Sequence, residues 1–125
     1  MIDKEKIERF EDMQVWQDAQ NLAVSVYSLT KSFPTEEQYA LSNQMRRCSS
    51  SISANIAEGF GRKSSKDKSQ FYRIAYGSLL ETKNFIYLAQ RLNYIPEATT
   101  ANLVNEIESL QRQVNAILGY FKNNA

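Results

Sequence analysis

The chain has 125 residues, of which 42% are hydrophobic and 23% charged, and its formal net charge is +1. This composition is typical of a globular protein and excludes a disordered chain, and the length fits one domain spanning residues 1–125. A net charge this close to zero excludes strong overall attraction to nucleic acid, so any such contact has to come from a local cluster of basic residues.

Histidine is absent from the sequence, and Cys48 is its one cysteine. The commonest general base and metal ligand is therefore missing, which excludes Ser–His and Cys–His nucleophile pairs. No stretch approaches the roughly 20 apolar residues of a membrane span, and the charged N-terminal residues 1–6 lack the apolar region of a signal peptide. We expect a cytoplasmic protein that is not an enzyme, does not contact membranes and holds neither metal nor cofactor.

The first expected element is a helix over residues 13–33. Asp12 is a suitable N-cap with Phe10 before it as a hydrophobic staple, and Phe33 precedes Pro34, which favours a helix end there. Apolar residues recur at alternating spacings of four and three along this segment, the spacing of a narrow helical stripe: Val15, Ala19, Leu22, Val26, Leu29 and Phe33.

The second expected helix covers residues 36–58. Thr35 and Gln38 have the spacing of a capping box, and Gly59 stands where a glycine often follows the last helical residue. The apolar stripe continues through Leu41, Met45, Cys48 and Ile52 to the polar Asn55, with Ile56 beside it.

Two further helices are expected over residues 65–92 and 96–122. Ser64 or Ser65 can cap the first of them, and Pro96 suits the opening turn of the second. The third stripe is widened by Ile74, Leu79 and Ile86 around the series Phe71, Ala75, Ser78, Thr82, Phe85, Ala89 and Leu92. The fourth stripe is Leu103, Ile107, Leu110, Val114, Ile117 and Phe121. Because short connections join long helices, the sequence predicts an all-α, antiparallel up-down-up-down four-helix bundle.

Several polar residues lie on the two central helices of this bundle. With a turn near residues 61–62, an antiparallel register brings Arg46 and Arg47 within reach of Ser78 and Glu81. A buried or half-buried Arg–Glu pair would help to specify that register.

Asn55 and Glu58 lie one turn apart near the end of the second expected helix. A glutamate there opposes the helix dipole, and Arg62 or Lys63 could compensate it. The pair forms either a local capping cluster or part of a polar site for a ligand or partner.

The third expected helix carries a second apolar stripe about 100° from its core stripe: Tyr72, Tyr76, Leu80 and Tyr87. A helix that is apolar around more than half of its circumference is usually buried on two sides. We therefore expect this stripe to be an oligomer face. The alternative is a broad core stripe whose tyrosine hydroxyls reach water.

Basic residues gather around the turn between the second and third expected helices. Residues 46–73 contain seven basic and two acidic residues, a local charge of +5. The tip of this region can contact the phosphates of RNA or DNA, although such a cluster can also be a solvated turn. The candidate contacts are Arg62, Lys63, Lys66, Lys68 and Arg73.

Five segments together resemble the bacterial four-helix-bundle proteins of the 23S rRNA-intervening-sequence type and the related accessory variability proteins of diversity-generating retroelements. The run Ser51–Gly59 (SISANIAEG) is the most specific of them; the others are Phe10–Trp16, Phe33–Pro34, Gln44–Arg47 and Ile74–Glu81. The resemblance extends from about Phe10 to Phe121. It implies a homopentamer of four-helix protomers, and its retroelement members are strongly basic nucleic-acid-binding proteins.

The leading functional prediction is an oligomeric binding or scaffold protein that contacts RNA or DNA through the basic tip. The alternative is a protein-binding assembly factor without nucleic-acid contact. An enzyme is disfavoured because Glu58 and Glu81, the carboxylates in helix-facing motifs, are predicted to lie several helical turns apart, too far for a cooperating pair.

Overall fold

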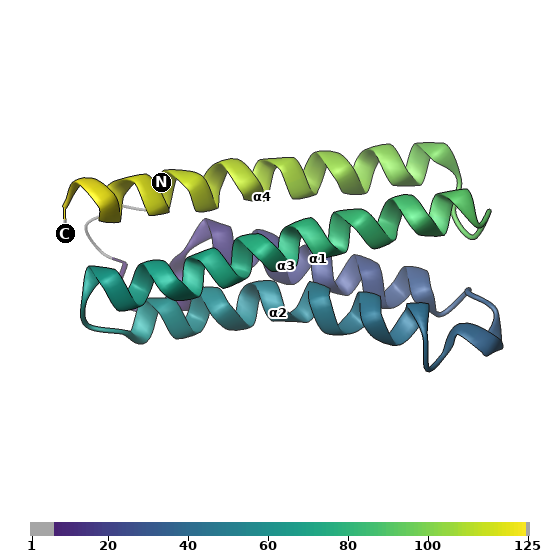
Figure 1. Ribbon diagram of the computed structural model, residues 1–125, viewed down its shortest axis with the longest axis horizontal. Coiled ribbons are helices and arrows are strands. Elements are labelled where there is room, and N and C mark those ends of the chain that lie inside the picture. The colour runs from purple at the N-terminus through teal and green to yellow at the C-terminus, as the bar shows by residue number, and fades with distance from the viewer. Residues whose placement is uncertain (1–6, 125) are drawn as a thin grey trace.

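The computed structural model describes residues 7–124, which form four long α-helices and two short 3-10 turns. In chain order these are η2 (Phe10–Asp12), α1 (Gln14–Thr30), η3 (Thr35–Glu37), α2 (Leu41–Gly61), α3 (Ser65–Arg91) and α4 (Glu97–Asn123). The helices lie lengthwise beside one another, and each runs opposite to the one before it (Figure 1). The predicted all-α, up-down-up-down bundle is confirmed.

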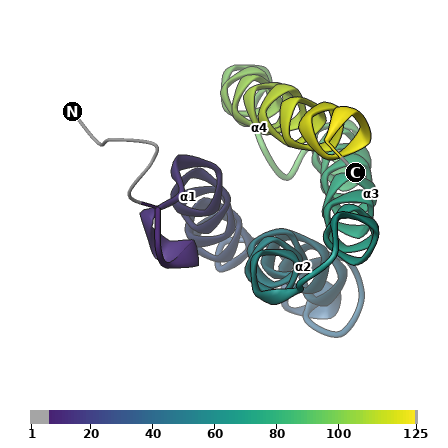
Figure 2. The ribbon, with the colours of Figure 1, turned by 90° about the vertical axis from the view of Figure 1, so that its left-hand side faces the viewer.

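The helices follow one another in chain order around the bundle, as the end-on view in Figure 2 shows. The closest packing is between α2 and α3, whereas α1 and α4 pack least closely. One end of the bundle carries the start of α1, the α2–α3 turn and the end of α4 (Figure 1). In the part of the chain that the structure describes, no helix is both long and apolar enough to cross a membrane.

The core takes side chains from all four helices at the predicted four-and-three spacing. The largest fully buried aliphatic side chains are Leu22, Val26, Met45, Ile52, Ile56, Leu79, Ile86, Ile107, Leu110 and Val114. Complete burial of one such side chain contributes about 1.5–3 kcal/mol. The apolar stripes of the sequence therefore account for the interior of the bundle.

Two residues that the sequence placed in the core of α3 lie outside it. Ile74 is 46% exposed and Leu92 is 44% exposed. The buried sector of α3 instead includes Ala75, Leu79 and Ile86, because this helix packs between α2 and α4 and its buried sector faces both neighbours.

The start of α1 differs from the prediction. The helix begins after Met13, which makes no side-chain cap, and it ends at Thr30 rather than at residue 33. Asp12 belongs to η2, where its carboxylate accepts a hydrogen bond from the N–H of Arg9 at 3.2 Å. Phe10 packs edge-on against Trp16, with ring centroids 5.2 Å apart. The capping prediction for Asp12 was wrong because an extra turn precedes the helix.

The start of α2 is five residues later than predicted, at Leu41 rather than at residue 36. Thr35 makes no side-chain cap, and the residues of the expected capping box form η3 instead. The carboxylate of Glu37 accepts a 2.7 Å hydrogen bond from the hydroxyl of Tyr94, whose ring also contacts Phe33. These contacts with the α3–α4 connection favour a tight turn over an early helix start.

Gly59 is not the glycine that ends α2, because the helix continues to Gly61. Gly59 is buried, and a Cβ placed on it would lie 3.0 Å from Cε2 of Tyr72 and 3.2 Å from Cβ of Phe71. The glycine therefore permits the close approach of α3 rather than a left-handed backbone conformation.

The later helix boundaries agree closely with the prediction. Ser64 caps α3, since its hydroxyl accepts a hydrogen bond from the N–H of Asp67 at 3.1 Å. Pro96 occupies the N-cap position of α4. Its preset backbone angle and missing N–H suit the start of a helix.

Candidate nucleic-acid interface

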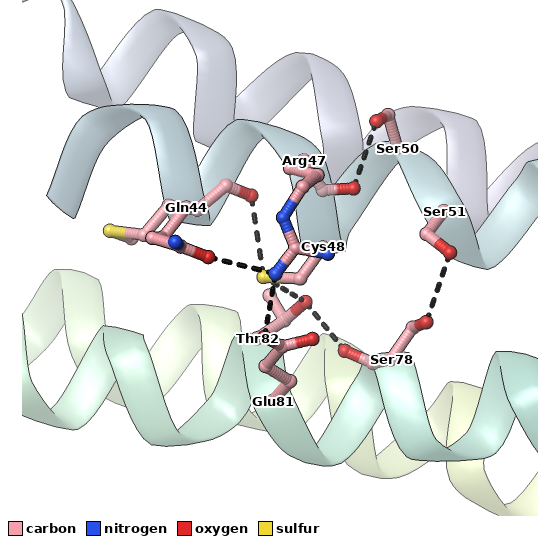
Figure 3. Close-up of polar contacts among 9 residues, drawn as sticks. Gln44, Arg47, Cys48, Ser50, Ser51, Ser78, Glu81 and Thr82 are labelled. Atoms are coloured by element: carbon pink, nitrogen blue, oxygen red, sulfur yellow. Dashed lines mark hydrogen bonds and ion pairs between the residues drawn. The ribbon is translucent and has the colours of Figure 1, made fainter. Parts of the chain in front are cut away.

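An ion pair joins α2 and α3 on the outer edge of their interface. The guanidinium of Arg47 donates to Glu81 at 2.9 Å and to Gln44 at 2.8 Å (Figure 3). The side chains of Arg47 and Glu81 are 58% and 39% exposed, so the pair is more open than predicted. At this exposure it contributes at most about 1 kcal/mol, and its main effect is to match the two helices in register.

Two hydroxyl contacts continue the same interface toward the core. The hydroxyl of Ser78 donates to that of Ser51 at 3.1 Å, and Thr82 contacts the sulfur of Cys48 at 3.3 Å (Figure 3). Burial raises the pKa of the Cys48 thiol above its usual value, so this thiol stays protonated near neutral pH.

Arg46 does not join this interface, contrary to the prediction. Its Nε donates to the hydroxyl of Thr30 at 2.8 Å, and its guanidinium lies 5.2 Å from the ring centre of Tyr27. Both partners belong to α1. Consecutive residues on a helix point about 100° apart, so Arg46 contacts α1 whereas Arg47 contacts α3.

Asn55 and Glu58 make local contacts. The amide of Asn55 donates to the carbonyl oxygen of Ser51 at 2.8 Å, and Glu58 pairs with Arg62 at 3.3 Å. The arginine thus lies where the sequence analysis expected a charge that compensates the glutamate. These contacts match the interpretation of a local cluster at the end of α2.

The predicted oligomer face divides into buried and exposed residues. Tyr72 is 1% exposed and packs on Phe121 with ring centroids 5.7 Å apart, so its assignment to the surface was wrong. Burial raises the pKa of Tyr72 to about 12. Tyr76 is partly buried against the core, whereas Leu80 and Tyr87 are 50% and 45% exposed. The buried surface of α3 therefore extends further toward α4 than the spacing of its apolar residues indicated, and it includes Tyr72.

Lys68 is not a free cation at the basic tip. Its ammonium donates to the carbonyl oxygens of Phe60 and Gly59, at 2.7 and 3.4 Å, which end α2. Partial burial lowers the pKa of Lys68 from its usual value. A cation at these carbonyls stabilises a helix end, so Lys68 can contact a phosphate only by giving up these bonds.

Arg62 is also engaged within the protein. Its guanidinium lies 4.6 Å from the ring centre of Phe71 and pairs with Glu58. The ion pair is exposed, with the two side chains 48% and 59% accessible, so water screens it. Arg62 can face a phosphate only in competition with Glu58.

Lys63, Lys66 and Arg73 are exposed, and none of them forms an ion pair with another residue in the range 7–124. Lys66 and Arg73 line a surface hollow together with Lys122 from the last turn of α4. Lys122 was not among the residues predicted from the sequence. It could have been predicted from the sequence. Because successive helices of the bundle run in opposite directions, the C-terminal end of the fourth helix lies at the same end of the bundle as the α2–α3 turn.

Acidic residues surround the start of α1, which lies at the same end of the bundle as the α2–α3 turn (Figure 1). Around the start of α1 lie Glu8, Glu11, Asp12 and Asp18, and the nearby Arg9 pairs with Glu11. At this end of the bundle, the exposed basic residues without an ion pair in the range 7–124 lie at the α2–α3 turn, on α3 and at the end of α4, and Asp67 of α3 is also exposed there. We call Lys63, Lys66, Arg73 and Lys122 the basic end.

The comparison with known families agrees with this architecture. The family model described as 23S rRNA-intervening sequence protein matches residues 11–116. The chain belongs to this family. A solved structure similar to this 23S rRNA-intervening sequence protein is that of a protein with unknown function from the S23 ribosomal protein family of Bacteroides thetaiotaomicron. The two share 25% sequence identity with a TM-score of 0.78, over 84% of this chain and 95% of that one. No curated protein matches the chain.

Proposed function

We propose that this member of the family is a non-catalytic binding protein that contacts nucleic-acid phosphates through the basic end. The observation that carries the proposal is the set of exposed cations at the basic end, of which none forms an ion pair with a carboxylate of residues 7–124. Such cations displace the counterions of a nucleic acid, which makes binding favourable and salt-dependent.

The proposal that the protein is not a catalyst rests on the ion pairs formed by Glu58 and Glu81. Glu58 pairs with Arg62 and Glu81 pairs with Arg47, on different stretches of the bundle surface. A pair of cooperating carboxylates needs to flank one reacting bond. Glu58 and Glu81 instead compensate neighbouring arginines.

The test is fluorescence anisotropy with a structured RNA and a duplex DNA across a salt series. Reversing three charges, with Lys63, Lys66 and Arg73 each changed to Glu, is expected to weaken binding on the order of 100-fold and to flatten the salt dependence. The matched control is Lys68→Met, which removes a lysine whose ammonium already donates to carbonyl oxygens at the end of α2. This variant is expected to keep its nucleic-acid affinity and to lose about 1 kcal/mol of stability in urea unfolding. A weak signal that does not change with salt in the wild type would instead favour a protein partner.

The exposed apolar side chains of α3 support self-association as part of the same proposal. Leu80 and Tyr87 are about half exposed and lie seven residues apart, on one face of α3, so together they offer an apolar surface that a second chain could cover. Changing both to Glu is expected to convert an oligomer into a monomer in sedimentation-velocity ultracentrifugation. Val24→Glu is the control, because Val24 is 67% exposed but lies on α1. A wild-type protein that sediments as a monomer at high concentration would exclude the oligomer.

A further inference from the structure

The hollow at the basic end lies between the start of α3 and the end of α4. Figure 2 looks onto this end of the bundle, where the last turn of α4 lies beside α3. Its volume is about 440 Å³. The hollow is open to solvent, and its volume falls within the range of about 300–1,000 Å³ of small-molecule sites, so it has room for a group as large as one nucleotide.

Its lining combines two kinds of surface. Lys66 and Arg73 come from one helix face of α3, two turns apart, and Lys122 comes from α4. The apolar residues Leu118 and Phe121 of α4 line the same hollow. A bare phosphate would use the cations alone, whereas a ligand with a flat apolar part would use both surfaces.

The aromatic residue of the lining, Phe121, is partly buried and packs against one core residue and one exposed residue. The ring of Phe121 packs against the rings of Tyr72 and Tyr120, each with centroids 5.7 Å away. Two hydroxyl groups, those of Ser65 and the nearly buried Ser69, also line the hollow and can donate to an anionic oxygen. The arrangement thus offers charge, hydrogen-bond donors and an apolar surface side by side.

We propose that this hollow binds one unpaired nucleotide of a nucleic acid, with its phosphate at Lys66, Arg73 and Lys122 and its base against Phe121 and Leu118. The proposal rests on the proposed phosphate contact and adds its selectivity. A base within a duplex is paired and stacked and cannot enter the hollow, whereas a base in a loop or at a strand end can. The protein therefore binds unpaired strands more tightly than duplexes.

Gly119 provides a test that changes no charge. It lines the hollow, and a Cβ placed on it meets no atom within 4 Å. Gly119→Phe fills the hollow, and Gly119→Leu does so more mildly in case the larger residue disturbs folding. The matched control is Gly77→Phe, since Gly77 has equally open surroundings on α3 but lies outside the hollow. Circular dichroism and sedimentation verify that all variants keep the fold and assembly of the wild type.

The experiment measures anisotropy of a labelled unpaired RNA, the same sequence as DNA, and a hairpin duplex. We expect the wild type to prefer unpaired strands and Gly119→Phe to weaken that binding about tenfold, with duplex binding and the Gly77→Phe control unchanged. Adenosine monophosphate should compete at lower concentration than inorganic phosphate or adenosine. The RNA and DNA arms show whether the sugar hydroxyl contributes.

Two failures are distinguishable. If the wild type binds unpaired and duplex strands equally, or if Gly119→Phe and Gly77→Phe behave alike, the hollow is not the site although the basic end still contacts phosphate. If the wild type binds none of the three probes, the proposed function itself is wrong, and the nucleotide site with it.

Discussion

Replacing Tyr72 by alanine is expected to lower the free energy of unfolding by about 4 kcal/mol. The side chain is 1% exposed and lies between Gly59 of α2 and Phe121 of α4. Its removal leaves a cavity that both neighbouring helices would have to fill. Urea unfolding followed by circular dichroism measures the change.

Tyr72→Phe is the control for this prediction, because it keeps the ring and removes only the hydroxyl. That hydroxyl has a weak partner, the sulfur of Met13 at 3.9 Å, so the variant is expected to differ from the wild type by less than about 1 kcal/mol. If Tyr72→Ala left the stability unchanged but dissociated an oligomer, Tyr72 would be a surface residue as the sequence pattern indicated.

Replacing Gly59 by leucine is expected to destabilise the protein by about 3 kcal/mol. The first added carbon would already lie 3.0 Å from the Tyr72 ring, which is buried and cannot turn away. The remaining carbons would force α2 and α3 apart along their closest interface. Thermal and urea unfolding together measure the loss.

Gly61→Leu is the matched substitution two residues later in the same helix. A Cβ on Gly61 meets no atom within 4 Å, so nothing opposes the better helix propensity of leucine; because Gly61 is the last residue of α2, only part of that advantage applies, and a gain of less than about 0.5 kcal/mol is expected. Effects of the same sign at both glycines would contradict the role assigned to Gly59.

The basic residues of the α2–α3 turn were evident from the sequence, but the sequence did not show which of them are already bonded within the protein. Lys63, Lys66 and Arg73 stay exposed as predicted. Lys68 instead caps α2, because the antiparallel packing brings its ammonium to the last carbonyls of that helix. Charge can be counted along a chain, whereas the partner of each charge depends on which helix ends meet.

The helix ends also differ in whether local or distant contacts determine them. The cap of α3 was predicted as Ser64 or Ser65 and is Ser64; the prediction came this close because the capping bond reaches only three residues along the chain. The start of α2 was predicted too early, since Glu37 bonds to Tyr94, a residue 57 positions away. Local signals therefore located the helix ends where no distant contact competes with them.

The sequence by itself determined that this protein is an all-α bundle, because the four-and-three spacing of apolar residues and the short connections allow few other arrangements. It also determined the family, through motifs that can be read without any structure. Only the tertiary structure decided that Gly59 serves helix contact, that Tyr72 is core, and that Lys122 joins Lys66 and Arg73. Each of these depends on the register and proximity of two helices, which arise from the packing of whole surfaces and not from the residues adjacent in the chain.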